Sequence, residues 1–347
     1  MESSPLLNDL LAGRTAALAR AISLVENGRA GFEELLGALH PRLGRAHRIG
    51  ITGPPGAGKS TLTMELTRAY RARGEQVGVV AVDPTSPFTG GALLGDRIRM
   101  EAVALDEGVF IRSMATRGSL GGLATSTREV CDVLDAAGFD RILVETVGVG
   151  QSELAVSSMA DSTVLVLVPE SGDGIQTLKS GVMEIADLFV VNKADRPGGD
   201  KLAREIEITL GFRQGNAFRG IRAHHGVDLQ AAARAPRPEP EATLDRWKHP
   251  VILTTASKAE GVDRLVAELD RHREWMKASG ELTVRRRRRL ASRTREVVDR
   301  AMHRWVWTST QAEAMVTERL DEVASGQLSP YELAGEIVAA LREGARV

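Results

Sequence analysis

The stretch RIGITGPPGAGKST, residues 48–61, decides how this 347-residue chain folds. An apolar run ends at Thr52, and Gly53–Ser60 then matches the pattern G-x-x-x-x-G-K-[ST] ahead of an amphipathic stretch. In this order of strand, loop and helix, glycines let backbone N–H groups converge on phosphate oxygens at the helix N-terminus. The pattern predicts a phosphate-binding loop. Its expected nucleotide-binding residues are Gly53, Pro54, Pro55, Gly56, Ala57, Gly58, Lys59, Ser60 and Thr61.

Outward from this loop, short apolar runs alternate with amphipathic stretches between residues 47 and 280. Most runs are rich in Val and Ile and lack strict polar alternation, which is typical of strands buried on both faces of a parallel sheet. The expected strands are 47–52, 76–82, 109–113, 141–146, 162–168, 187–191 and 251–254. The alternation predicts a doubly wound α/β domain with a mostly parallel sheet.

Helical patterns flank this domain. Leucines and alanines recur at helical spacing in residues 1–46, which we expect to form an N-terminal helical extension before a nucleotide-binding domain over 47–280. Residues 281–347 return to helix, with a turn at Gly326 to Pro330. The five arginines Arg285–Arg289 lie in an apolar-striped segment and are interpreted as the charged face of an amphipathic helix.

Composition excludes several classes of protein. The net charge is −1, so no global field attracts nucleic acid or anionic lipid. A single cysteine, Cys131, excludes a disulfide framework and a cysteine-rich metal site, and is interpreted as a small core residue. No apolar run approaches the roughly 18 residues of a membrane span, and the N-terminus lacks a signal-peptide core. We expect a soluble, cytoplasmic protein without nucleic-acid or membrane partners.

A second motif predicts which base is bound. Val190 and Val191 lead into Asn192-Lys193-Ala194-Asp195, an N-K-x-D sequence at the end of an apolar run. The Asp195 carboxylate can accept hydrogen bonds from N1–H and N2–H₂ of guanine, and adenine lacks both donors. We therefore expect GTP and GDP, with Asn192, Lys193 and Asp195 as base-site residues. Thr255, Ala256 and Ser257 form a weaker third loop, from which a backbone N–H could reach guanine O6.

Acidic positions between these motifs suit a metal ion and a water. Asp83 and Glu145 end apolar runs, and Asp96 lies in the glycine-rich stretch Gly90–Arg97. Lys59 is expected to reach the β- and γ-phosphates, while the Ser60 hydroxyl ligates Mg²⁺. We expect Asp83, Asp96 and Glu145 to serve the same Mg²⁺ or its water, with Lys59, Asp96 and Glu145 acting in hydrolysis. Gly148 has the spacing for a backbone N–H that senses the γ-phosphate.

Six stretches of the sequence, taken together, resemble one family of G proteins. GITGPPGAGKSTL, VDPTSPFTGGALLGDRIRM, FIRSMATRGSLGGLA, ILVETVGVGQSE, ESGDGIQTLKSGVMEIADL and VVNKAD occur in this order. They are similar to the MeaB and methylmalonic aciduria type A proteins, also labelled ArgK or LAO/AO transport ATPases. The resemblance is strong over residues 45–275 and weaker at the helical ends.

The resemblance implies a G domain of the signal-recognition and MinD-like class that hydrolyses GTP slowly until a partner stimulates it. Family members chaperone adenosylcobalamin-dependent acyl-CoA mutases, typically methylmalonyl-CoA mutase, gating cofactor delivery and protecting the mutase. It further implies that Glu170–Lys179 is a third switch, that Lys179 supplies positive charge during phosphoryl transfer, and that the C-terminal arm forms a homodimer. The chain lacks a D-x-H-x-x-G motif, so adenosylcobalamin is expected only on the partner.

Two alternatives stay open at this point. A nickel-insertion GTPase of hydrogenase or urease maturation would carry Cys and His ligands near its switches, whereas this chain has one cysteine and seven histidines, including the pair His224-His225. A kinase, as the transport-ATPase label suggests, conflicts with the N-K-x-D sequence. The sequence names neither the acyl-CoA mutase nor a role for residues 213–247.

Overall fold

The computed structural model describes residues 5–83, 101–115, 120–146, 152–170, 182–213 and 246–344. The chain divides into two compact units, Met1–Thr283 and Val284–Val347. The first unit is built on a sheet of seven strands in the order β3-β2-β4-β1-β5-β6-β7, and every neighbouring pair is parallel. The doubly wound α/β fold predicted from the sequence is confirmed.

The strands lie where the apolar runs predicted them. They are β1 (His47–Thr52), β2 (Val77–Asp83), β3 (Val109–Ala115), β4 (Arg141–Thr146), β5 (Ser162–Leu167), β6 (Leu188–Asn192) and β7 (Val251–Thr254). In the central strands β4, β5 and β6 every residue is buried, because helices cover both faces of the sheet.

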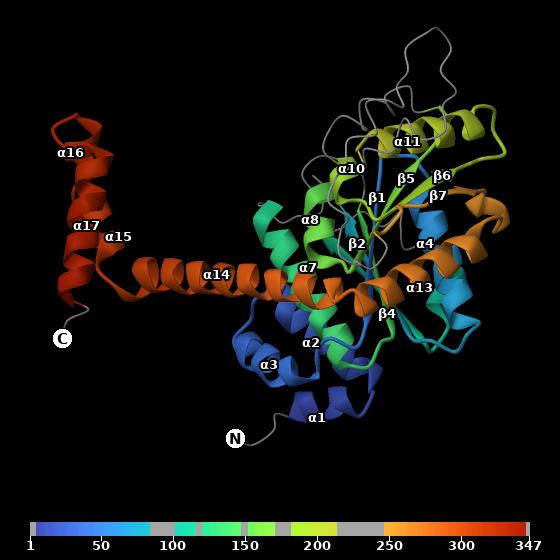
Figure 1. Cartoon of the computed structure of the whole chain (residues 1–347). Coiled ribbons are helices and arrows are strands. Elements are labelled where there is room, and N and C mark those ends of the chain that lie inside the picture. Colours follow the sequence, from blue (N-terminus) through green and yellow to red (C-terminus); the bar gives the residue numbers. More distant parts are fainter. Residues whose placement is uncertain are drawn as a thin grey trace, which may run out of the picture. The chain divides into compact units, whose positions relative to one another are not determined.

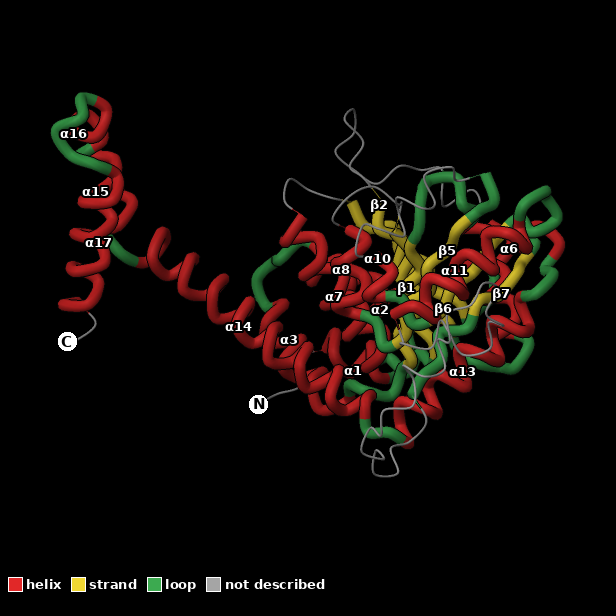
Figure 2. Tube along the Cα trace, turned by 45° about the horizontal axis from the view of Figure 1, so that its top comes forward, coloured by secondary structure: helices red, strands yellow, loops and turns green. Residues whose placement is uncertain are grey.

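Two helices cover one face of the sheet, and a larger group covers the other (Figure 1, Figure 2). The first face carries α4 (Lys59–Arg71) and α13 (Val262–Ala278), which pack on side chains such as Ile51 and Val166. The opposite face carries α7 (Leu120–Ala136), α8 (Ser152–Met159), α10 (Val182–Ile185) and α11 (Gly199–Arg213). The short helix α6 (Glu101–Ala104) precedes β3.

The N-terminal helices share the core of the sheet. They are α1 (Pro5–Leu11), α2 (Thr15–Glu26) and α3 (Phe32–Leu39), followed by the 3₁₀ turn η1 (His40–Arg42), and their apolar side chains pack against α7. The buried Asp135 carboxylate of α7 accepts N–H bonds from Gly44, Arg45 and Ala46 at 2.9–3.1 Å, which fixes the entry into β1. Cys131 is fully buried in α7, as predicted. The three-part division of the chain at residues 46 and 280 stays a prediction.

The second unit is helical. The 29-residue helix α14 (Glu281–Ser309) carries the arginine run, and α15 (Ala312–Glu318), α16 (Leu320–Ala324) and α17 (Pro330–Gly344) follow it. Ala312, Leu328, Leu333 and Ile337 form a small hydrophobic cluster within this unit. On α14, Leu290, Val298 and Trp305 are 45%, 52% and 39% exposed. Within the described ranges, no helix has the length and hydropathy needed to cross a bilayer.

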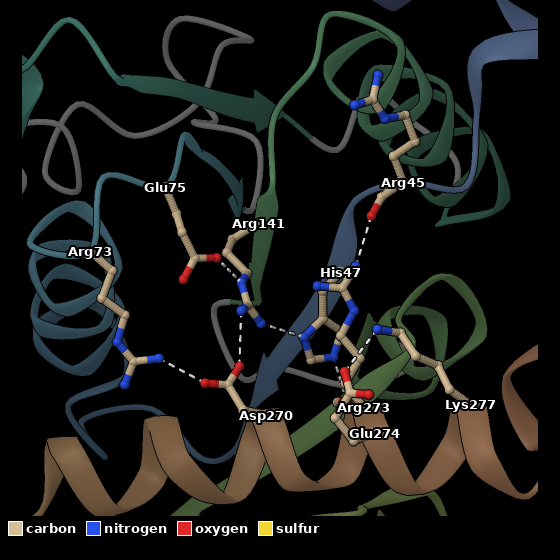
Figure 3. A network of polar contacts seen from close by, with 10 residues as sticks. Arg45, His47, Arg73, Glu75, Arg141, Asp270, Arg273, Glu274 and Lys277 are labelled. Carbon is tan, nitrogen blue, oxygen red and sulfur yellow. Dashed lines mark hydrogen bonds and ion pairs between the residues drawn. The ribbon is translucent and has the colours of Figure 1, made fainter.

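A buried polar network closes the edge of the sheet where the strands begin (Figure 3). Arg141, the first residue of β4, donates to His47 Nδ1 at 2.9 Å and to Glu75 at 2.5 Å, and pairs with Asp270 of α13 at 2.9 Å. His47 Nε2 lies 2.7 Å from Ser162 Oγ, which lies 2.8 Å from His272 Nδ1. The network therefore ties β1, β4 and β5 to α13, the helix that follows the predicted third base loop.

Candidate functional site: a guanine-nucleotide site

The loop between β1 and α4 is held in a shape that only glycine accommodates at two positions. Gly53 has φ of +142°, and a Cβ there would lie 2.1 Å from the backbone oxygen of Val166 in β5. Gly58 has φ of +86°, and a Cβ there would lie 2.4 Å from Asn192 Nδ2. L-residues disfavour both backbone conformations. The loop is thus seated directly on β5 and β6 at the carboxyl edge of the sheet, where ligands bind in open α/β folds.

Lys59 and Ser60 begin α4 beneath this loop. Lys59 is buried, and its Nζ donates to the carbonyl oxygens of Gly53 at 2.9 Å and Pro54 at 3.0 Å. The ammonium thus lies against the loop itself, in reach of any phosphate that the loop would surround. The Ser60 hydroxyl donates to Glu145 Oε1 at 2.5 Å, and Glu145 is only 4% exposed at the end of β4. A hydroxyl and a carboxylate in contact are the hard oxygen ligands that Mg²⁺ prefers, so the pair fits a magnesium site.

Asn192 joins the predicted base loops to the phosphate loop. Its Nδ2 donates to Ala57 O at 2.8 Å, while its Oδ1 accepts from Thr254 Oγ1 and Ala256 N, each at 3.0 Å. Lys193 makes a second bridge, from Nζ to Gly56 O at 2.8 Å. Residues predicted from separate motifs therefore converge in one place, at the ends of β1, β6 and β7.

Asp195 and the third loop face each other. The Asp195 carboxylate lies 3.3 Å from Lys258 Nζ, in the turn that follows β7, and both side chains are partly exposed. The Ala256 N–H donates to Asn192 Oδ1 at 3.0 Å, so this loop is tied to the N-K-x-D loop. Thr255 closes the loop by exchanging backbone bonds with Glu260 at 3.0 and 3.3 Å.

Several predicted site residues lie outside the described part of the chain. They are Asp96, Gly148 and Lys179, and the stretch 214–245, which includes His224 and His225, is outside it too. Asp83 is described as the last residue of β2, paired with Ala115, but its side chain is not. Their roles in metal binding and hydrolysis stay predictions.

Sequence reasoning missed two residues of the site. Thr254 bonds the Asn192 oxygen, and Lys258 pairs with the Asp195 carboxylate. Lys258 directly follows the Thr255–Ser257 loop, so its position in the chain was a usable signal. Thr254 carried none, because a threonine ending a strand is common and its partner is 62 residues away.

Comparison with known proteins identifies the family. The sequence profile described as "Methylmalonyl Co-A mutase-associated GTPase MeaB" matches residues 18–311. The chain belongs to the MeaB family. The resemblance drawn from the sequence motifs is therefore confirmed.

Similarity to individual relatives extends over almost the whole chain. A Pyrococcus abyssi protein that carries the name "Putative GTPase" is 42% identical to this chain. The match covers 96% of this chain and 95% of that protein. The Escherichia coli GTPase ArgK is 33% identical, over 92% and 90%, and the mitochondrial methylmalonic aciduria type A homolog of Mus musculus is 33% identical, over 97% and 79%. A solved structure described as an LAO/AO transport system kinase matches 97% of the chain with 27% identity and a TM-score of 0.63, over 96% of that structure.

Proposed function

We propose that this chain is a GTP-hydrolysing chaperone of an adenosylcobalamin-dependent acyl-CoA mutase, with methylmalonyl-CoA mutase as the first candidate partner. In this role it gates cofactor loading and protects the mutase from inactivation. The observation that carries the nucleotide part is the Asp195 carboxylate, set beside a phosphate loop to which Asn192 and Lys193 bind directly.

Guanine selectivity follows from the chemistry of Asp195. An ionised carboxylate only accepts hydrogen bonds, and guanine offers it N1–H and N2–H₂ while adenine offers neither. Guanine must displace Lys258 from the carboxylate, which is a small cost because exposed ion pairs contribute about 1 kcal/mol or less. Adenine would also displace Lys258 but leave the carboxylate without a donor, so the site favours GTP over ATP.

Hydrolysis would use Lys59 and Glu145 beside the loop, together with predicted residues outside the described ranges. Lys59 would exchange its bonds to the Gly53 and Pro54 carbonyls for the β- and γ-phosphate oxygens, where its charge stabilises the transition state. Glu145 would orient a water for in-line attack on the γ-phosphorus, so that the bond to the β–γ bridging oxygen breaks and GDP and phosphate form. Ser60, with Asp83, Asp96 and Glu145, would hold Mg²⁺, which neutralises phosphate charge when bound. Lys179 would add positive charge from the Glu170–Lys179 loop.

The partner is proposed from family membership. The matching profile names a mutase-associated GTPase, and one relative is named for methylmalonic aciduria type A. The exposed apolar side chains of α14 support a homodimer formed through the C-terminal arm, since burying such a stripe against a second copy is favourable. Adenosylcobalamin would reside on the mutase.

The test is GTP and ATP turnover by the purified chain, alone and with the adenosylcobalamin-dependent mutase of the same genome. We expect slow turnover of GTP only, rising about tenfold or more with one mutase, which corresponds to roughly 1.4 kcal/mol of barrier. Asp195→Asn should remove the preference for GTP, because an amide presents a donor to guanine N1–H, whereas Asp200→Asn, on the exposed start of α11, should not. Equal use of ATP would refute the guanine site, and a rate that no mutase changes would refute the partner.

A further inference from the structure

The carboxylate proposed to accept guanine is in contact with a lysine of the turn that follows β7. Asp195 Oδ2 lies 3.3 Å from Lys258 Nζ, and the two side chains are 39% and 54% exposed. Arg196, the residue after Asp195, donates to Glu170 Oε1 at 2.6 Å and is engaged there. Within the described ranges, Lys258 is therefore the cation that contacts the Asp195 carboxylate.

Backbone hydrogen bonds hold the turn that carries Lys258. The Lys258 N–H donates to Thr255 O at 2.8 Å, and Thr255 and Glu260 exchange two backbone bonds across the turn. Gly261 ends the turn with φ of +76°, and a Cβ there would lie 2.2 Å from Leu253 O. The backbone position of Lys258 is thus set by the fold, whereas its side chain can change partner by rotating about single bonds.

The same turn is fastened to the N-K-x-D loop. The Ala194 N–H donates to Thr254 O at 3.0 Å. Asn192 Oδ1 accepts from Thr254 Oγ1 and from the Ala256 N–H, also at 3.0 Å. Because these bonds join the two loops, the lysine ammonium stays within reach of the carboxylate when the contact between them is broken.

Guanine needs the atom that Lys258 contacts. Its N1–H and N2–H₂ donors lie side by side and pair with the two oxygens of one carboxylate, so acceptance of both by Asp195 requires Oδ2. Lys258 and the base therefore compete for the same oxygen. The competition is mild, because an ion pair between partly exposed side chains contributes little in water. It changes the affinity for nucleotide without closing the site.

We propose that Lys258 is an internal competitor of guanine at Asp195, and that it sets the affinity for GTP and GDP below the value that the rest of the site would give. Lys258 acts through the Asp195 carboxylate and bonds to neither base nor phosphate. The nucleotide is thereby held less tightly and exchanges more readily. The inference rests on the proposed function, because it takes Asp195 as the guanine acceptor.

The experiment measures the GDP affinity of the full-length chain by calorimetry in the presence of Mg²⁺. Lys258→Met removes the ammonium and keeps a long side chain, whereas Lys258→Arg keeps the charge. Asp195→Asn and the double variant Lys258→Met/Asp195→Asn complete a double-mutant cycle. Lys201→Met is the matched control, because Lys201 is an exposed lysine of α11 that pairs with Glu205 at 3.9 Å.

Lys258→Met should bind GDP about two- to fivefold more tightly than the wild type, the range that an exposed ion pair supports. Raising the salt concentration from about 0.05 M to about 0.5 M should narrow this difference, because salt screens the pair in the wild type. Lys258→Arg and Lys201→Met should keep the wild-type affinity. In the Asp195→Asn background, Lys258→Met should have no effect, since the amide carries no charge for the lysine to pair with.

Different failures separate the two proposals. If the wild type binds no GDP, or binds ADP equally well, the proposed function is overturned. If GDP binding is selective but Lys258→Met leaves the affinity unchanged or weakens it, only the competition is overturned, because the lysine would then have no effect on the site or would contact the nucleotide itself. A tightening that persists in the Asp195→Asn background overturns the competition too, since the lysine would then act by another route.

Discussion

At the scale of single residues, Arg141 determines which nitrogen of His47 carries the proton. Arg141 can only donate, so His47 Nδ1 accepts and the His47 proton sits on Nε2, directed at Ser162 Oγ. Ser162 Oγ also lies 2.8 Å from His272 Nδ1, and His272 Nε2 lies 3.5 Å from Asp187 Oδ1. His47 is therefore neutral in the folded protein, because its Nδ1 accepts a hydrogen bond from Arg141.

This arrangement predicts loss of stability in acid. Burial holds the pKa of His47 well below its ordinary value of 6.5, opposed by Asp161 and reinforced by Arg141. The unfolded chain takes up a proton at His47 below about pH 6.5 while the folded chain does not, so stability is present above that pH and declines below it. The expected slope from this one residue approaches 1.4 kcal/mol per pH unit.

The measurement is the free energy of urea unfolding between pH 7 and pH 5 for the wild type and for His47→Asn. The variant loses stability at pH 7 but should show a shallower pH slope, by up to one proton. His40→Asn, at an exposed position in η1, should leave the slope unchanged. An unchanged slope in His47→Asn would contradict this, because it would show that His47 takes up protons equally in the folded and unfolded states.

At the scale of secondary-structure elements, β1 and α8 approach closely at Gly50. A Cβ at Gly50 would lie 2.4 Å from Val156 Cγ1 and 3.0 Å from Ala160 Cβ. Gly50→Ala should destabilise the fold by about 1–3 kcal/mol, since overpacking a close contact moves the helix away from the strand. The free energy of unfolding tests this, and a double-mutant cycle with Val156→Ala should show that the second change relieves part of the first.

The control substitution should change the free energy of unfolding in the opposite direction. Gly37 lies in α3, and nothing lies within 4 Å of a Cβ added there. Gly37→Ala should stabilise the protein by about 0.5–1 kcal/mol, because alanine has the better helix propensity. If Gly50→Ala behaves like Gly37→Ala, α8 does not pack as tightly on β1 as the structure shows.

At the scale of the whole molecule, the two units have separate hydrophobic clusters. The clusters around the sheet draw only on residues up to Trp275, and the Ala312–Ile337 cluster draws only on the second unit. A chain ending at Thr283 should therefore fold and bind GDP with an affinity within about twofold of the full chain, since every described base- and phosphate-site residue is retained. Calorimetry and analytical ultracentrifugation check this, and the shortened chain should sediment as a monomer while the full chain sediments as a dimer. A shortened chain that unfolds, or one that stays dimeric, would contradict these two expectations respectively.

Much of the fold could be predicted because its signals are local. The phosphate loop is a run of eight residues whose glycines are required by backbone geometry, and each buried strand is a short apolar run. Their order along the chain, with helices between, permits few topologies for a parallel sheet. The amphipathic helix of the arginine run and the buried cysteine were likewise set by nearby residues.

What the sequence by itself determined is the strands of the sheet and the residue types of two loops: residues 53–60, predicted to bind phosphate, and residues 192–195, predicted to bind the base. The tertiary structure decided which distant residues meet. Asn192 bonds Ala57 across 135 residues, Ser162 bridges His47 and His272 across more than 100 on either side, and Arg196 meets Glu170. The physical reason is that these contacts depend on strand order and register, which arise from packing of the whole sheet rather than from any local propensity.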